Sequence, residues 1–280
     1  MTQVVVRPRD HDFRVFLPGP WWWLSVAAAA IAAVGSIIGL LATQRIYGRE
    51  TTGFIDQSTA QDAVNLAVVV PLTVALGFRA RRGSVPAFTC WLGCVAFTAY
   101  SYAIYAFAIH FGPLFLAWVA VLGLSFYALL GALTTADLSA VSRWFGDRAM
   151  RVTGWTLVVS AAAFALLWLS RIVPDLLAGR ASASAAALNL PTNPVHVLDL
   201  ALFLPAVLAS ATLLLCRRPL GYVTAPGVLL FLALTCVPVL VTPLMSLAYD
   251  RTPDWGATAP IGVVFLVSAG VLVRTVRRPH

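Results

Sequence analysis

The sequence predicts an all-α polytopic membrane helix bundle, with about eight transmembrane helices in two parallel four-helix repeats. Composition gives the first reason, because 60% of the 280 residues are hydrophobic, 11% are charged, and mean hydropathy is +0.87. Soluble domains carry roughly 25% charged residues. The long apolar runs and the arginines between them give the second and third reasons. Together they place most of the protein's surface in lipid.

Each long apolar run is sufficient for one membrane helix, which needs about 20 residues. Trp21, Trp22 and Trp23 open the first run and suit a membrane interface, so this run is predicted to be an uncleaved first span. None of the connections is long enough for a second soluble domain. The predicted spans lie near residues 20–43, 62–79, 85–108, 113–135, 152–173, 195–216, 221–245 and 257–276.

The arginines predict the orientation of the chain. Fourteen of the 19 basic residues fall at the chain ends and in alternate connections, whereas the other connections hold only five, namely Arg45, Arg49, Arg171, Arg180 and Arg251. The arginine-rich side of a membrane protein faces the cytoplasm. We therefore expect a multi-pass protein of the plasma membrane with both termini in the cytoplasm.

The two predicted repeats share a pattern of residues. Asp62 and Asp199 each lie near the start of a span, each is followed by a proline (Pro71, Pro205), and each span ends in arginines. Four spans per half give both halves the same orientation, so the expected relation is a rotation about the membrane normal. A single integral membrane domain, 1–280, would then comprise a cytoplasmic segment, 1–19, a first half, 20–151, and a second half, 152–280.

Three stretches of the chain carry a resemblance. The segments IYGRETTGFIDQSTAQDAVNL (46–66), NPVHVLDLALFLPA (193–206) and RRPLGYVTAPG (217–227) resemble bacterial and archaeal multi-pass proteins described only as hypothetical membrane proteins. The resemblance extends over most of the chain. It implies a membrane fold and brings no activity, cofactor or site residue with it.

Polar residues gather at the predicted outer rim, where they form the candidate site. An acid–base role is assigned to Asp62, Asp199, His196 and Glu50, and Asp62 and Asp199 are expected to face each other across the pseudo-twofold axis. A carboxylate near the membrane interior needs a partner, and His196 lies on the same helix face as Asp199, so the functional interpretation is an acid–base or metal-binding pair. The predicted substrate-binding residues are Tyr47, Gln61, Asn65, Tyr100, Tyr102 and Tyr105.

Each candidate also has a structural interpretation. Asp62 fits a helix-capping role, because Ser58 with Gln61, or Thr59 with Asp62, matches a capping box. Asn193 and Pro194 form a better cap and first-turn pair for the sixth span, so the alternative for His196 and Asp199 is a local hydrogen bond. Glu50 would form a solvated loop salt bridge with Arg45 or Arg49. The tyrosines would form an aromatic belt, although Tyr100 and Tyr102 point to different faces and one of them should face the bundle interior.

These residues leave three functions open. The first is a membrane-embedded enzyme that acts on a lipidic or isoprenoid-like substrate at an outer pocket. The second is a transporter or channel for a small or lipidic solute, which predicts a cavity reaching mid-membrane and discontinuous helices near Pro71, Pro205, Pro238 or Pro243. The third is a non-catalytic assembly or sensory protein. No phosphate-binding, hydrolase or zinc motif occurs, so no metal is assigned and the cofactor is left open.

The predicted partners are the lipid bilayer and, at the cytoplasmic face, anionic lipid; the arginine distribution argues against nucleic acid. Residues 139–151 (SAVSRWFGDRAMR) form a short basic amphipathic segment. Its apolar side chains Trp144, Phe145 and Met150 are expected to lie in the headgroup layer, while its arginines meet anionic headgroups.

Overall fold

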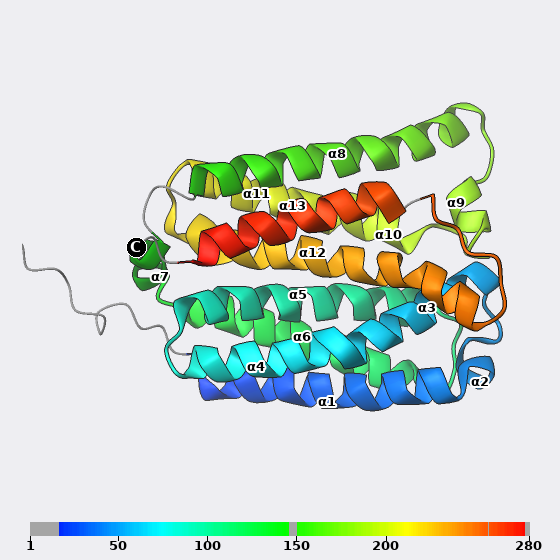
Figure 1. Cartoon of the computed structure of the whole chain (residues 1–280), viewed down its shortest axis with the longest axis horizontal. Helices are drawn as coiled ribbons and strands as arrows, with labels where there is room; N and C mark the ends of the chain where they lie inside the picture. Colours follow the sequence, from blue (N-terminus) through cyan, green and yellow to red (C-terminus); the bar gives the residue numbers. More distant parts are fainter. Residues whose placement is uncertain (1–16, 146–149, 257, 278–280) are drawn as a thin grey trace, which may run out of the picture.

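The computed structural model describes residues 17–145, 150–256 and 258–277, and within these ranges it is built of helices without any strand. Eight helical stretches in the described part of the chain are long and apolar enough to span a membrane, which confirms the all-α class and the eight spans. They lie roughly side by side along one axis (Figure 1). The predicted segment 1–19 and several N-terminal arginines fall almost wholly outside the described residues.

Six of the eight spans are single helices, and each of the other two is a helix interrupted by a π-helical turn. The first span is α1 (Gly19–Leu41), and α2 (Thr43–Tyr47) follows it. The second span, Thr52–Arg81, combines α3 (Thr52–Val64), the π-helical turn η2 (Asn65–Val69) and α4 (Val70–Arg81). The third and fourth spans are α5 (Val85–Ala108) and α6 (Phe115–Thr135).

The second half of the chain follows the same plan. After α7 (Leu138–Phe145), the fifth span is α8 (Met150–Leu177), and α9 (Ala183–Ala186) lies in the next connection. The sixth span, Pro194–Leu215, combines α10 (Pro194–Leu198), the π-helical turn η3 (Asp199–Phe203) and α11 (Leu204–Leu215). The last two spans are α12 (Pro219–Ala248) and α13 (Thr258–Val276).

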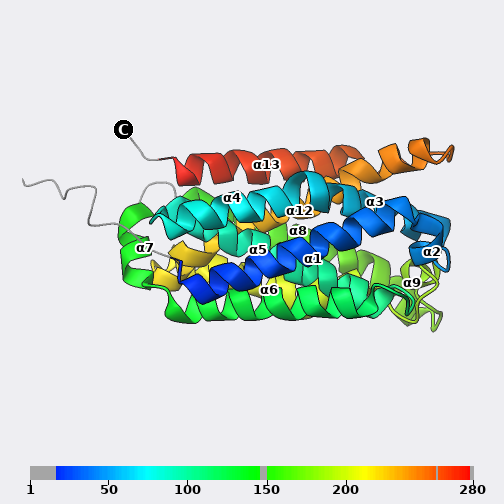
Figure 2. The ribbon, with the colours of Figure 1, turned by 90° about the horizontal axis from the view of Figure 1, so that it is seen from below.

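Alternate connections lie at opposite ends of the bundle. α7 lies at one end and α2 and α9 at the other, as the views along and across the bundle agree (Figures 1 and 2). We call these the α7 end and the α2/α9 end. The sequence predicts that the α7 end is cytoplasmic, and this orientation stays a prediction.

Helices α5 and α12 pack against each other at the centre of the bundle. A methyl group added to Gly93 would lie 2.2 Å from the carbonyl oxygen of Gly227, and one added to Gly227 would lie 2.6 Å from that of Thr89. One turn further along, the rings of Phe97 and Phe231 meet edge to face at 5.8 Å. Only glycine permits the two backbones to approach this closely.

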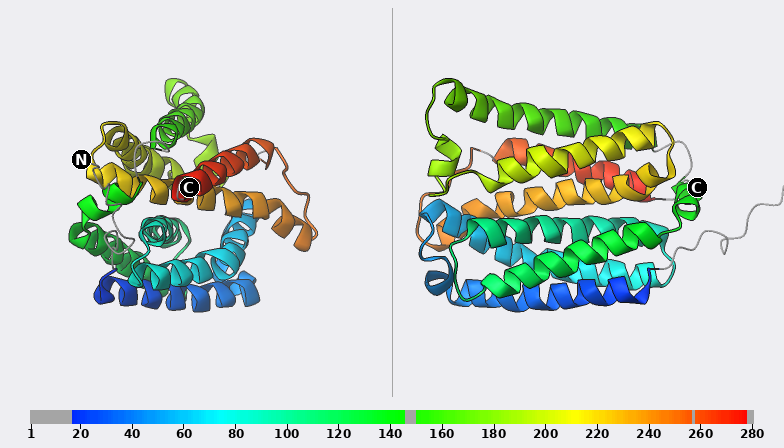
Figure 3. Two further views of the ribbon diagram at one scale, coloured as in Figure 1. Left: turned by 60° about the vertical axis from the view of Figure 1, so that its left-hand side comes forward. Right: turned by 180° about the vertical axis from the view of Figure 1, so that it is seen from behind.

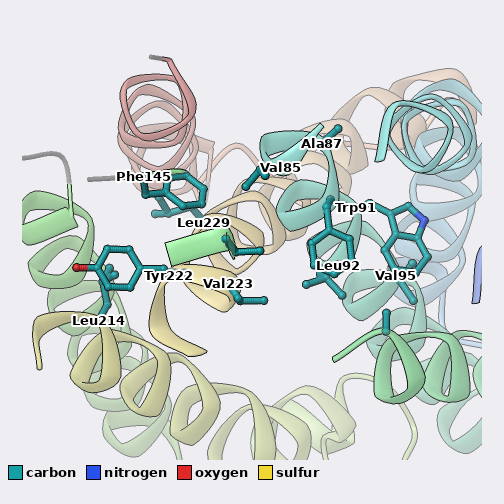
Figure 4. Packing of buried hydrophobic residues seen from close by; sticks show 14 of the residues in the cluster. Val85, Ala87, Trp91, Leu92, Val95, Phe145, Leu214, Tyr222, Val223 and Leu229 are labelled. Atoms are coloured by element: carbon teal, nitrogen blue, oxygen red, sulfur yellow. The ribbon is translucent and has the colours of Figure 1, made fainter. Parts of the chain in front are cut away.

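A large apolar cluster extends from this α5–α12 contact toward the α7 end. It includes Trp91 and Leu92 of α5 and Val223 and Leu229 of α12, and Figure 4 shows these side chains together with those of α7 and α11. Phe145 and Met150 are buried in the same cluster, 6% and 3% exposed. The expectation that they lie in the headgroup layer is therefore wrong, because α7 turns its apolar face onto the bundle.

The two halves differ in how tightly they pack. α8 stands apart from the rest of the bundle (Figure 3), and only 11% of its most apolar stretch is buried, against 39% for α1. α5 is the most buried span, at 78%. Large side chains along α8, such as Val159 and Leu166, are exposed. Lipid contact is expected along this helix, whereas α5 has almost none.

Two segments of the chain repeat the same local geometry. η2 is followed after one residue by Pro71, and η3 after one residue by Pro205; residue 199 lies 134 positions after residue 65. Both helices end in a left-handed residue, Gly83 (φ 90°) and Arg217 (φ 56°), again 134 positions apart. The close pairs Gly93–Gly227 and Phe97–Phe231 have this same separation. The four-helix repeat as a whole stays a prediction.

Candidate functional site

Asp62 lies well inside the second span, which begins at Thr52 rather than near residue 62. Ten residues of helix precede it, or about 15 Å at 1.5 Å per residue. The helix extends this far because its polar residues are themselves buried: Thr59 is 0% exposed and Ser58 4%. Thr51 occupies the N-cap position, so the capping role expected for Asp62 is wrong.

Three hydroxyl groups from three helices donate to the Asp62 carboxylate. Tyr47 of α2 donates at 2.6 Å, Ser36 of α1 at 2.8 Å and Tyr105 of α5 at 3.0 Å. Asp62 is 2% exposed. Burial and the neighbouring carboxylate raise the pKa of the Tyr47 hydroxyl far above its usual value, so this group remains a protonated donor.

Gly39 makes room for this cluster. A methyl group at Gly39 would lie 2.2 Å from Oδ2 of Asp62 and 2.8 Å from the Tyr47 hydroxyl. Gly35, one turn earlier on α1, has nothing within 4 Å of such a methyl group. Because Gly39 has no side chain, the Asp62 carboxylate and the Tyr47 hydroxyl can lie close to α1.

The polar groups continue from Asp62 toward the α7 end. The amide of Asn65 donates to the Ser36 hydroxyl at 3.3 Å and accepts from Gln61 at 2.8 Å. Asn65 also borders a cavity of about 10 Å³, which has room for about one water molecule. The polar residues that line this cavity are Ser25, Asn65, Thr73, Thr98, Tyr102 and Ser125.

A tryptophan layer lies one helical turn beyond this cavity. Trp22, Gly77 and Trp91 lie three or four residues from the cavity residues Ser25, Thr73 and Val95 on the same three helices. A methyl group at Gly77 would lie 2.1 Å from the Trp22 ring and 3.0 Å from that of Trp91. The indole N–H of Trp91 is buried and has no hydrogen-bond partner among the described residues. These rings lie one helical turn from the cavity, on its α7 side.

Asp199 belongs to a different cluster. Its carboxylate accepts hydrogen bonds from the indole N–H of Trp168 at 2.7 Å and from the Tyr100 hydroxyl at 2.8 Å. Asn193 caps the helix, as predicted, by accepting from the backbone N–H groups of Val195 and His196. His196 contacts the Trp168 ring at a centroid distance of 4.6 Å. No described hydrogen bond joins His196 to Asp199, so the expected direct pair is replaced by a contact through Trp168.

Glu50 is separate from both aspartates. It is 8% exposed, and it accepts from the backbone N–H of His110 at 2.8 Å and contacts the His110 ring nitrogen Nδ1 at 2.9 Å. The expectation of a solvated loop salt bridge with Arg45 or Arg49 is therefore wrong. Burial between the α2–α3 and α5–α6 connections gives Glu50 a structural partner instead.

The predicted acid–base residues thus belong to three separate clusters, around Asp62, Asp199 and Glu50. Tyr100 and Tyr105, which bind the two aspartates, lie five residues apart on α5, about 140° around the helix at 3.6 residues per turn. The described hydrogen bonds give Asp62 and Asp199 no common partner. Of the predicted substrate-binding residues, Tyr47, Gln61, Asn65 and Tyr105 gather at Asp62, and Tyr102 borders the cavity.

Two further buried acids were not among the candidates. Asp56 accepts from Ser246 at 2.8 Å and pairs with Arg251, which joins α3 to the end of α12. Asp175 accepts from Arg180 at 2.7 Å and from the backbone N–H of Ala183 at 2.9 Å. Arg251 follows the end of α12, and Arg180 lies in the connection between α8 and α9. Both ion pairs therefore stabilise the α2/α9 end of the bundle.

Comparison with known proteins yields no family. No protein-family model, no curated protein and no solved structure matches the chain. In the described ranges, no three potential ligands from His, Cys, Asp and Glu converge on a metal position. The function is therefore argued from the geometry of the Asp62 cluster.

Proposed function

We propose that the protein translocates protons across the membrane and that the Asp62 carboxylate is its proton-binding site. One observation carries the proposal: a buried carboxylate inside a span has only uncharged donors among the described residues. Hydrogen bonds through Ser36 and Asn65 link it to a cavity about the size of one water molecule. Ionisable groups inside membrane spans commonly mark ion or proton pathways.

Two other buried acids, Glu50 and Asp56, provide a contrast. Glu50 and Asp56 each contact a nitrogen group that can carry positive charge, namely His110 and Arg251. Among the described residues, no arginine or histidine forms an ion pair with Asp62. An isolated charge in a medium of low dielectric constant is costly, so uptake of a proton relieves Asp62 without an added ion.

The size of the cavity favours the proton over a larger cargo. About 10 Å³ holds one water molecule, which is too little for an organic cation or a lipid. The Ser36 hydroxyl and the Asn65 amide link Asp62 to the lining of this cavity. A hydrogen-bonded route for a proton thus extends from Asp62 into the membrane interior.

The tryptophan layer implies that translocation requires a conformational change. Trp22 and Trp91 lie one helical turn beyond the cavity on one side, and Tyr47 binds the Asp62 carboxylate on the other. We infer that the two halves are structural repeats related about an axis along the α5–α12 contact. The matching π-helical turns, left-handed helix ends and self-paired positions support this, because a twofold axis brings each residue against its own counterpart. Movement of one half against the other is the usual basis of alternating access.

The enzyme hypothesis has less support. The carboxylates of Asp62, Asp199 and Glu50 do not converge, and protein groups cover each of them. The small cavity also lacks room for a lipidic substrate. Catalysis by these residues stays a prediction, as does a purely structural role.

Proton flux into liposomes tests the proposal. Purified protein is reconstituted with a pH-sensitive dye inside the vesicles, and a potassium diffusion potential is imposed. We expect wild-type protein to acidify the lumen and Asp62→Asn to abolish this flux. Asp254→Asn is the matched control, because Asp254 lies in an exposed connection. Equal flux through wild type and Asp62→Asn, at equal reconstitution, would overturn the proposal.

A further inference from the structure

We propose that Asp199, with Trp168 and Tyr100, forms a second proton-binding site in the second half, which senses protons without conducting them. The inference rests on the proposed function in one respect, since Asp62 is taken as the conducting site. The second site uses a different carboxylate with different partners, so an experiment can contradict either proposal without contradicting the other.

The Asp199 carboxylate is buried with neutral donors. It is 6% exposed, and its two hydrogen bonds come from the Trp168 indole of α8 and the Tyr100 hydroxyl of α5. The other titratable or charged groups at this cluster are His196 of α10, which contacts Trp168, and Arg171 of α8, whose charge acts on His196. None of the described ion pairs includes Asp199. It therefore resembles Asp62 and differs from Glu50 and Asp56.

The position of Asp199 corresponds to that of a cavity residue in the first half. Asp199 and Asn65 are each the first residue of a π-helical turn, and π-helical turns occur frequently at functional sites. Asn65 contacts the polar cavity. The backbone feature that presents Asn65 to the conducting cavity is thus also present at Asp199.

The surroundings of Asp199 lack a polar route into the membrane. The residues 134 positions after Thr73, Thr98 and Tyr102 are Val207, Leu232 and Cys236. Val207 is 0% exposed and Leu232 2%, and both belong to the large apolar cluster. At these positions the described residues offer a proton bound at Asp199 no onward hydroxyl partner, which makes the site a sensor rather than a step in the pathway.

Helix α5 connects the sensor to the conducting site. Tyr100 binds Asp199 and Tyr105 binds Asp62, although the two acids belong to different halves. When Asp199 takes up a proton, its carboxylate becomes neutral and its charge-assisted bonds to Tyr100 and Trp168 weaken. This change acts on α5 at the contact between the halves.

Trp168 fluorescence reports on this site directly. The protein contains nine tryptophans, so the Trp168 signal is obtained as the difference between wild type and Trp168→Phe in liposomes. We expect this signal to change on acidification in two components. Asp199→Asn removes one, and His196→Gln removes the other, because a protonated imidazole at 4.6 Å perturbs the indole.

The outcomes separate the two proposals. Asp62→Asn should leave the Asp199 component in place. The second site is overturned if both components survive Asp199→Asn, or if Asp62→Asn also removes the component that Asp199→Asn removes. Asn retains an oxygen acceptor for Trp168, and Tyr100→Phe provides a second variant, which should shift the midpoint of the same component. If liposome flux is independent of Asp62 while the Asp199 component is present, the proposed function fails and the sensor stands.

Discussion

The two interrupted spans, Thr52–Arg81 and Pro194–Leu215, place different side chains on a similar local backbone. In the first half a π-helical turn lies beside a buried aspartate with three hydroxyl donors and a polar cavity. In the second half the matching turn begins with the aspartate itself, and the corresponding interior positions are apolar. The two segments therefore share a local backbone and differ in their interior side chains. We propose that this difference in polarity is what makes only the first a proton pathway.

The largest expected effect comes from the contact between the halves. Gly93→Ala places a methyl group 2.2 Å from the Gly227 carbonyl oxygen, and a backbone atom cannot turn aside as a side chain does. We expect a loss of about 3 kcal/mol in the free energy of unfolding, the upper part of the range for overpacking. Denaturant titration in mixed micelles measures it. Gly227→Ala should cost a similar amount if the contact is symmetric.

Gly123→Ala is the control for this prediction, because nothing lies within 4 Å of a methyl group there. Alanine also has the higher helix propensity, so Gly123→Ala should be neutral or slightly stabilising. A similar stability for Gly93→Ala and Gly123→Ala would show that the halves are not held as closely as the structure indicates.

A second prediction concerns Gly39, which has no counterpart in the second half, where Val173 occupies the position 134 residues later. Gly39→Ala would place its methyl group 2.2 Å from the Asp62 carboxylate. We expect a cost of about 1–3 kcal/mol, together with reduced proton flux, as the carboxylate is displaced. Gly35→Ala, one turn away, should change neither quantity. Normal proton flux through Gly39→Ala would show that transport does not depend on the position of the Asp62 carboxylate in this cluster.

The smallest effect is expected when one cavity position is made to resemble the second half. Thr98→Val removes a hydroxyl that lines the cavity and donates to the Cys94 carbonyl at 2.9 Å. This bond lies within one helix, so we expect a stability change of about 1 kcal/mol or less. Proton flux should nevertheless fall. Thr235→Val is the control, since Thr235 makes the same type of bond on α12 and is not a lining residue of the cavity. Unchanged flux through Thr98→Val would place the route elsewhere.

Much of the fold was predictable from the sequence, because lipid imposes a length and a composition on each span. The eight spans and the cap at Asn193 were predicted correctly. The start of the second span was not, because residues 52–61 are too polar to resemble a membrane helix. Three of their polar residues, Asp56, Ser58 and Thr59, are buried in the bundle, a property of tertiary packing that local hydropathy does not contain.

The candidate site was predictable in its residues and not in its grouping. Asp62, Tyr47, Asn65 and Tyr105 were selected as polar residues in apolar surroundings, and they do meet. Asp199 was assigned to the same site on the assumption that the two aspartates are equivalent. The π-helical turns pair Asp199 with Asn65 instead, and such turns leave no clear signal in a sequence.

The most direct test of the central claim is the infrared spectrum of the Asp62 carboxyl group. Difference spectra between acidic and alkaline buffer are recorded for wild type, Asp62→Asn and Asp254→Asn in liposomes. Proton binding at Asp62 predicts a C=O band of a buried, protonated carboxyl group that appears on acidification in wild type and in Asp254→Asn. The band should be missing in Asp62→Asn. If the wild-type and Asp62→Asn spectra are identical, Asp62 does not exchange a proton, and the account of this protein as a proton translocator is contradicted.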